Sequence, residues 1–162
     1  MLVAVQTNAS CTALLPLETL THLIWRQSPM QPTKRRVLCV DDDDDTCFLL
    51  THLLRQENYE VVTSKTVSEA IELARNESFS LYILDEWFPI EEGVGLCRKI
   101  REFDPHTPII FYSGAAFESD RQEALYAGAQ AFVAKPYVDQ LIETIHRLLT
   151  DQQETTREDV RA

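Results

Sequence analysis

The sequence predicts an α/β fold in which five parallel strands alternate with five helices to form a doubly wound sheet. Two observations predict it. About 115 residues from Lys34 onward alternate between short apolar runs and longer segments with apolar residues at helical spacing. The short runs are apolar throughout, as strands are when helices cover both faces of a parallel sheet. With 162 residues, of which 44% are hydrophobic, the chain can bury the core of one such domain.

The first half of the domain opens with RVLCV at 36–40, a short apolar run with β-branched residues that predicts a buried strand. A helix is expected over 46–59, and EVVTS at 60–64 is a second strand. The segment 67–77 contains no helix breaker and predicts the second helix, with Ser68 as its N-cap. The apolar residues at helical spacing in the first helix are Phe48, Leu49, Leu53 and Leu54.

The second half repeats this alternation three times. Short apolar runs predict the remaining strands at 80–84, 108–113 and 129–134. Helical patterns follow them at 92–103, 118–128 and 138–149. Gly128 closes the fourth helix, because glycine is the residue that most often ends one.

Both ends of the chain differ from this regular part. Residues 1–35 are rich in Thr, Ser, Gln and Pro and are predicted to be a poorly ordered extension, or one short amphipathic helix built on LETLTHLIWRQ at 17–27. Met30 is as good a candidate for the start of translation as Met1. Residues 36–150 are the predicted domain, and residues 151–162 have few apolar side chains and are expected to be disordered.

Charge and composition exclude several classes of function. The formal net charge of −11 disfavours nucleic acid and anionic membranes as partners. No apolar run approaches the ~18 residues of a membrane span, and no signal peptide is recognisable, so a cytoplasmic protein is expected. The cysteines lack the spacing of a zinc site and are predicted to be reduced, structural thiols; they are Cys11, Cys39, Cys47 and Cys97.

Reactive side chains follow four of the five predicted strands. Asp41 to Asp45 follow the first strand, Asp85 the third, Ser113 the fourth and Lys135 the fifth. In an open parallel sheet such groups gather outside the carboxyl ends of the strands. Carboxylates that hold Mg²⁺, a lysine and a hydroxyl suit phosphoryl transfer, with one carboxylate able to act as nucleophile. No GxxxxGK[ST] motif is present, so direct nucleotide binding is not expected.

Four motifs appear in order along the predicted domain: VDDD at 40–43, ILDEWFPIEEG at 83–93, YSGA at 112–115 and GAQAFVAKP at 128–136. On these motifs the chain resembles, from Arg36 to Leu149, the receiver domains of bacterial two-component response regulators. The resemblance implies a flavodoxin-like sheet with strand order 2-1-3-4-5. It also implies a phosphoacceptor protein and not a conventional enzyme.

The resemblance assigns a role to each site residue. Asp85 matches the aspartate that takes the phosphoryl group from a histidine kinase or a histidine phosphotransfer protein. Asp41, Asp42 and Asp85, with the backbone carbonyl of Trp87, match the Mg²⁺ ligands. Ser113, Lys135 and the aromatic switch residue Phe132 complete the set. In the family, partners read the state from the face formed by the fourth helix, fifth strand and fifth helix.

Some features of the sequence refine this expectation. The bulk of Trp87 and the lack of a polar group at Ala115 predict slow autodephosphorylation, and Phe132 can switch only by packing because it has no hydroxyl. The chain ends soon after the fifth helix, so output through an unidentified downstream protein is expected, with a phosphorylation-dependent homodimer as a further possibility.

Three other interpretations of these motifs are less favoured. Asp42-x-Asp44-x-Thr46 fits the opening motif of haloacid-dehalogenase-type phosphatases, with Asp42 as nucleophile, but leaves Asp85 unexplained. A calcium loop starting at Asp41 lacks its glycine and its bidentate glutamate. A degenerate receiver that acts only as an interaction module remains open. In the favoured interpretation, Asp41 and Asp42 belong to the metal site, Asp43 has a minor role, and Asp44 and Asp45 begin a helix.

Overall fold

The computed structural model describes residues 2–5, 13–16, 34–89, 92–114 and 117–159. The chain divides into two compact units, at residues 1–33 and 34–162. In the first, β1 (Leu2–Val5) pairs antiparallel with β2 (Ala13–Pro16). This strand pair was not predicted, because two four-residue runs give too short a pattern to identify a hairpin. The helix predicted at 17–27 lies outside the described residues.

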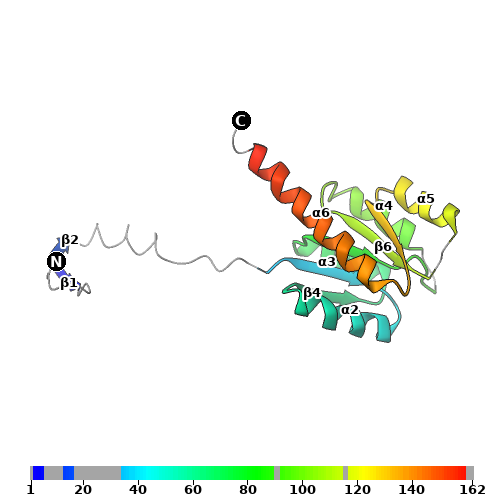
Figure 1. The fold of residues 1–162 in the computed structure, drawn as a ribbon, viewed down its shortest axis with the longest axis horizontal. Coiled ribbons are helices and arrows are strands. Elements are labelled where there is room, and N and C mark those ends of the chain that lie inside the picture. The colour runs from blue at the N-terminus through cyan, green and yellow to red at the C-terminus, as the bar shows by residue number, and fades with distance from the viewer. Residues whose placement is uncertain (1, 6–12, 17–33, 90–91, 115–116, 160–162) are drawn as a thin grey trace. The chain divides into compact units, whose positions relative to one another are not determined.

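The second unit contains the predicted sheet of five parallel strands (Figure 1). Its order is β4-β3-β5-β6-β7, which is the expected order 2-1-3-4-5 when the strands of this unit are counted along the chain. The first two strands have the predicted bounds and the last three are one to two residues shorter. The strands are β3 (Arg36–Val40), β4 (Glu60–Ser64), β5 (Leu81–Leu84), β6 (Ile109–Ser113) and β7 (Ala131–Ala134).

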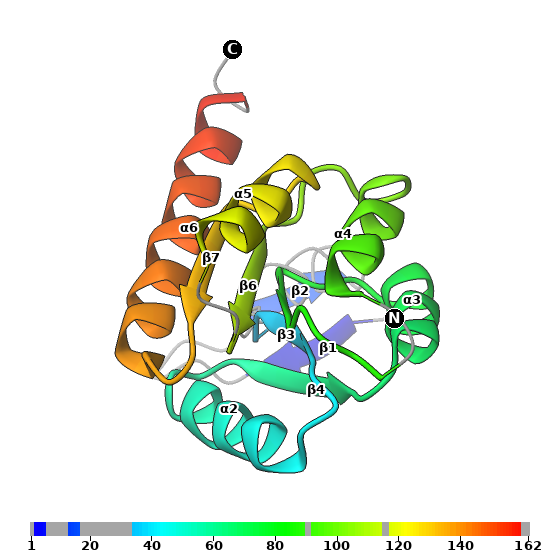
Figure 2. The same cartoon turned by 90° about the vertical axis from the view of Figure 1, so that its right-hand side faces the viewer.

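Helices cover both faces of this sheet, as Figure 2 shows. One face carries α3 (Val67–Asn76), α4 (Gly93–Arg101) and α5 (Glu118–Tyr126). The other carries α2 (Asp44–Gln56) and α6 (Val138–Asp159). Successive β3 residues alternate between the two cores: Leu38 and Val40 pack with α3 and α4, while Val37 and Cys39 pack with α2 and α6. Burial on both faces explains why the runs of β3, β5 and β6 are predominantly apolar.

The helix boundaries differ from the prediction at identifiable residues. Helix α2 begins at Asp44 as expected, but it ends at Gln56 because Asn58 adopts a φ of 65°, outside the helical region. The Ser68 cap was wrong. The N-cap of α3 is Thr66, whose side chain accepts a hydrogen bond from the backbone N–H of Glu69. Helix α6 continues to Asp159, through residues that were expected to be disordered.

The described helices and cysteines bear on two of the expectations drawn from the composition. Within the described residues, no helix combines the length and the apolar character needed to cross a membrane. Three of the four cysteines, Cys39, Cys47 and Cys97, are buried free thiols, which agrees with their predicted structural role. Burial raises the pKa of Cys47 and of Cys97 to about 11, so both thiols are protonated at neutral pH.

Candidate functional site

The site lies at the carboxyl edge of the sheet, where β3 and β5 end side by side. Each strand's ladder continues one residue beyond its end: the N–H of Asp41 donates to the carbonyl of Ser64, and that of Asp85 donates to the carbonyl of Val40. The two aspartates therefore project from neighbouring, rigidly paired backbone. The sequence predicts this placement, because an aspartate directly after a buried parallel strand lies at the carboxyl edge of the sheet.

Asp41, Asp42 and Asp85 form a compact cluster of carboxylates. One oxygen from each lies within 4.8 Å of the others. Asp41 is 2% exposed and Asp85 8%, whereas Asp42 faces solvent. Hard oxygen ligands with an open, hydrated side are what Mg²⁺ favours, so the donor set fits this ion. Among the described residues, this is the one group of His, Cys, Asp and Glu side chains with metal-compatible spacing.

Lys135 supplies a cation to the same cluster from the end of β7. Its Nζ donates to Asp41 Oδ2 at 2.7 Å and to Asp85 Oδ2 at 3.2 Å. Burial works against the charged ammonium, but the hydrogen bond to Asp41 and the charge of Asp85 outweigh it, and the pKa of Lys135 lies above its ordinary value. For the Asp41 carboxyl, burial raises the pKa, although the hydrogen bonds from Lys135 and from the N–H of Asp43 act to lower it.

Ser113 and Phe132 lie on β6 and β7, the two strands that follow β5 in the order of the sheet. Ser113 ends β6, is fully buried, and its carbonyl accepts a hydrogen bond from the N–H of Lys135 at 2.8 Å. Phe132 on β7 is half-buried and stacks on Phe111 of β6, with ring centroids 6.3 Å apart and planes inclined by 10°. The hydroxyl and the aromatic ring thus belong to adjacent strands that are in hydrogen-bonded register.

The loop after β5 brings Trp87 and Gly93 into the surroundings of Asp85. Trp87 pairs with Glu92 in an isolated bridge, and its side chain is 61% exposed. A Cβ on Gly93 would lie 2.0 Å from the carbonyl oxygen of Asp85, so only glycine fits here. The N–H of Gly93 donates to the carbonyl of Glu86 at 2.8 Å. The glycine that ends ILDEWFPIEEG therefore closes the loop against the backbone of Asp85.

Three residues near the site have roles that sequence reasoning missed or understated. Asp43 caps α2, because its carboxylate accepts hydrogen bonds from the N–H and the hydroxyl of Thr46. The Cys47 thiol donates to the carbonyl of Asp41 at 3.3 Å. Glu86 is 7% exposed, and burial together with Asp120 and Glu123 raises its pKa to about 7. The Asp43-x-x-Thr46 spacing was a readable cap signal, whereas the burial of Glu86 depends on tertiary packing.

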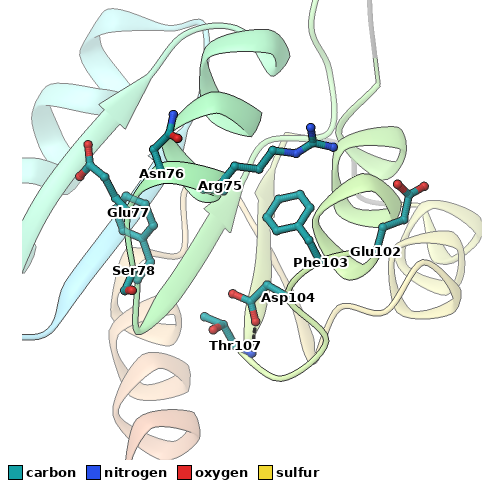
Figure 3. A pocket seen from close by; sticks show the side chains of 10 residues that line it. Arg75, Asn76, Glu77, Ser78, Glu102, Phe103, Asp104 and Thr107 are labelled. Carbon is teal, nitrogen blue, oxygen red and sulfur yellow. Dashed lines mark hydrogen bonds between the residues drawn. The ribbon is translucent and has the colours of Figure 1, made fainter.

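Another cavity in the described part of the chain lies at the opposite edge of the sheet. It has a volume of about 630 Å³ and is lined by residues at and just after the ends of α3 and α4, among them Phe79, Phe103 and Asp104 (Figure 3). Asp104 is already engaged by the N–H of Thr107 and the hydroxyl of Tyr82, and Arg75 lies over the ring of Phe103. These contacts are structural, so the cavity does not compete with the carboxylate cluster as a site.

Comparison with known families agrees with this geometry. The family model described as the response regulator receiver domain matches residues 37–146. The regulatory protein VanR of Enterococcus faecium is 37% identical over 103 residues, covering 63% of this chain and 44% of VanR. The transcriptional regulatory protein YrkP of Bacillus subtilis is 32% identical over 130 residues, covering 74% of this chain and 55% of YrkP. The chain thus spans about half the length of the curated relatives it matches.

Solved structures give the same result for the fold. A CheY-like response regulator receiver domain protein from Methanospirillum hungatei is 31% identical, with a TM-score of 0.72, and the match covers 76% of this chain and 99% of that one. The beryllofluoride-activated receiver domain dimer of NtrC4 is also 31% identical, with a TM-score of 0.68 over 72% of this chain and 97% of that one. Both matches cover nearly the whole of the solved receiver domain.

Proposed function

Because the chain belongs to the response regulator receiver domain family, we propose that Asp85 is its phosphoacceptor and that the phosphoryl group comes from the phosphohistidine of a sensor kinase or a histidine phosphotransfer protein. The observation that carries this proposal is the contact of Asp85 with both the acidic cluster and Lys135. Asp85 is the one carboxylate of the three that also follows the central strand β5.

In the proposed reaction a carboxylate oxygen of Asp85 attacks phosphorus. An O–P bond forms, the N–P bond of the phosphohistidine breaks, and the imidazole leaves with that electron pair and takes up a proton. The product is an acyl phosphate on Asp85. Lys135 lies within hydrogen-bond distance of Asp85 and can neutralise phosphoryl oxygens, and the N–H of Glu86 holds Asp85 Oδ1 at 2.8 Å, which orients the carboxylate.

The donor set around Asp85 supports Mg²⁺ as the cofactor. Asp41, Asp42 and Asp85 would hold the ion together with the backbone carbonyl of Trp87. When bound, Mg²⁺ supplies charge neutralisation for the transferred phosphoryl group. The buried carboxylate of Asp41 has a raised pKa, which indicates that its negative charge is under-compensated by Lys135 alone and would gain from a second cation.

We propose that signalling then proceeds through Ser113 and Phe132. Phosphorylation adds negative charge and acceptor oxygens at Asp85, and the hydroxyl of Ser113 gains a hydrogen bond by moving toward them. Phe132 repacks on the neighbouring strand, and the change reaches the face formed by α5, β7 and α6. Large apolar side chains are exposed there, including Leu125 and Tyr126 on α5 and Tyr137 before α6, and these suit a cytoplasmic protein partner or a homodimer.

The decisive experiment locates a stable adduct. The protein would be treated with Mg²⁺ and beryllofluoride, or with phosphoramidate, and the modified residue identified by mass spectrometry and by NMR shifts. Modification of Asp85 and its loss in Asp85→Asn are expected. An adduct on Asp42 would instead indicate a haloacid-dehalogenase-type phosphohydrolase, and no adduct at all would indicate an interaction module that works without phosphorylation. A pull-down with wild type against Asp85→Asn would then separate state-dependent partners from constitutive ones.

A further inference from the structure

A second cavity, of about 480 Å³, opens beside the carboxylate cluster. Its apolar part is formed by Val67 at the start of α3 and by Phe88 and Pro89 after β5. Polar residues complete it: Asp42, Lys65, Thr66 and Ser68. These residues follow the ends of β4, β3 and β5, three neighbouring strands, so the recess lies on the same edge of the sheet as Asp85.

Two of the four polar residues around this recess already have partners. Lys65 forms an ion pair with Asp44, and the Thr66 hydroxyl accepts from the N–H of Glu69. The surface of the recess that is available to a ligand is therefore mainly apolar. Next to Phe88 in the chain, Trp87 exposes 61% of its surface. An exposed tryptophan next to an apolar hollow is the usual composition of a protein–protein contact centre.

The recess lies close enough to Asp85 to be covered by a protein that donates a phosphoryl group to it. The carboxylate of Asp42 belongs both to the recess and to the cluster that includes Asp85, whose oxygens lie within 4.8 Å of one another. A specific interface covers about 800 Å² on each partner, a patch roughly 30 Å across. Any protein that brings a histidine ring onto Asp85 must therefore also cover the recess. A small phosphodonor has no need to do so.

We propose that this recess receives an aliphatic or aromatic side chain of the phosphohistidine-bearing donor protein and so selects the donor. The inference rests on the proposed phosphoacceptor function and adds the surface by which the donor is recognised. A donor that lacks a matching apolar side chain would leave the recess hydrated and bind more weakly, which is how an interface discriminates between related partners.

The test fills the recess without touching the acidic cluster. Ser68 is exposed at the second position of α3 and lines the recess, so Ser68→Phe places a ring there with little risk to folding. Ser68→Ala is the control for loss of the hydroxyl. Glu72→Phe adds the same ring to an exposed position one turn along the same helix, outside the recess. Each full-length variant would be labelled with phosphoramidate and, separately, by phosphotransfer from the histidine kinases and phosphotransfer proteins of the same genome.

Phosphoramidate should label all four proteins at equal rates. Transfer from the best protein donor should be slower in Ser68→Phe by about tenfold or more, and unchanged in both controls. Equal transfer to Ser68→Phe and wild type overturns the inference, as does a matching loss with phosphoramidate. Labelling by phosphoramidate without transfer from any histidine donor also overturns it but leaves Asp85 as phosphoacceptor. Absence of labelling by phosphoramidate overturns the phosphoacceptor function itself.

Discussion

The Nζ atom of Lys135 lies 2.7 Å from Oδ2 of Asp41, although the two residues are 94 positions apart in the chain. The contact joins the ends of β3 and β7, which are separated in the sheet by β5 and β6. Because Asp41 is almost fully buried, its charge needs a nearby cation in the absence of metal. Lys135 meets part of this need and at the same time competes electrostatically with any metal that uses the same carboxylates.

The first prediction is that Lys135→Met binds Mg²⁺ more tightly than wild type, by about tenfold. Removing one positive charge near the ion removes a repulsion of several kcal/mol at an intermediate dielectric constant, and greater protonation of the carboxylates offsets part of it. Isothermal titration calorimetry at pH 7 and fixed ionic strength measures the dissociation constant. Lys65→Met, which removes a cation paired with exposed Asp44, should bind Mg²⁺ almost as wild type does. Unchanged or weaker binding by Lys135→Met would contradict the competition.

The second prediction concerns the lifetime of the acyl phosphate. If the indole of Trp87 keeps water from the phosphoryl group, Trp87→Asn should shorten the half-life of phosphorylated protein several-fold, because asparagine is smaller and can orient a water molecule. Loss of labelled phosphate over time, measured with Mg²⁺ present, gives the rate. Tyr137→Asn removes another exposed ring near the carboxyl edge and should leave the half-life unchanged. A half-life in Trp87→Asn equal to that of wild type would show that the ring does not shield the site.

Most of the fold could be predicted because its strands are buried on both faces. Runs such as VLCV at 37–40 and LYIL at 81–84 are buried along their whole length, and helices with clear periodicity separate them. The errors occur where local geometry overrides the pattern. Asn58 ends α2 three residues early by adopting a positive φ, and Thr66 takes the cap role expected of Ser68 because its hydroxyl reaches the N–H of Glu69.

The site was predictable to the extent that it depends on strand ends. Asp41, Asp85 and Lys135 each follow a strand directly, and Ser113 is the last residue of one. The structure clusters Asp41, Asp42 and Asp85, and Lys135 hydrogen-bonds to Asp41 and Asp85. The rest depends on tertiary relationships. The sequence gives no signal that Gly93 must approach the carbonyl of Asp85, or that Glu86 is buried with the charges of Asp120 and Glu123 acting on it.

The third prediction concerns Arg101, which ties the end of α4 to two loops. Its guanidinium donates to the carbonyls of Gly128, Asp104 and Thr107 and to the side chain of Gln130, at 2.8 to 3.0 Å. Arg101→Met keeps the packing against Gly128 but removes these four hydrogen bonds, so the free energy of unfolding should fall by about 2–4 kcal/mol. Urea denaturation followed by circular dichroism measures it.

Arg98, one turn earlier on the same helix, provides the matched control. It is exposed and forms a 3.5 Å ion pair with exposed Glu123, so Arg98→Met should cost at most about 1 kcal/mol. Equal losses in the two variants would mean that the hydrogen bonds of Arg101 contribute no more than a surface charge does.

The last prediction is a pH dependence that arises far from the metal site. Asp104 accepts hydrogen bonds from Tyr82, His106 and Thr107, and although burial opposes this, they hold the pKa of its carboxyl below the ordinary value of 3.8. The folded state therefore gains stability from the ionised carboxylate above this pH and loses it as the pH falls through the lower pKa of the folded protein. Asp104→Asn should lower the free energy of unfolding by about 1–2 kcal/mol at pH 7, with a smaller deficit at pH 3.

A double-mutant cycle with Tyr82→Phe identifies the charge as the cause. The Tyr82 hydroxyl donates to Asp104 Oδ2 at 2.9 Å, and that hydrogen bond is stronger to an ionised carboxylate than to a neutral carboxyl. The coupling energy between the two substitutions should be about 1 kcal/mol at pH 7 and should decline as the pH falls through the lowered pKa of Asp104 in the folded protein. A coupling that stays constant while the pH falls through that pKa would assign the effect to packing of the two side chains and would contradict the ionised state of Asp104 as its source.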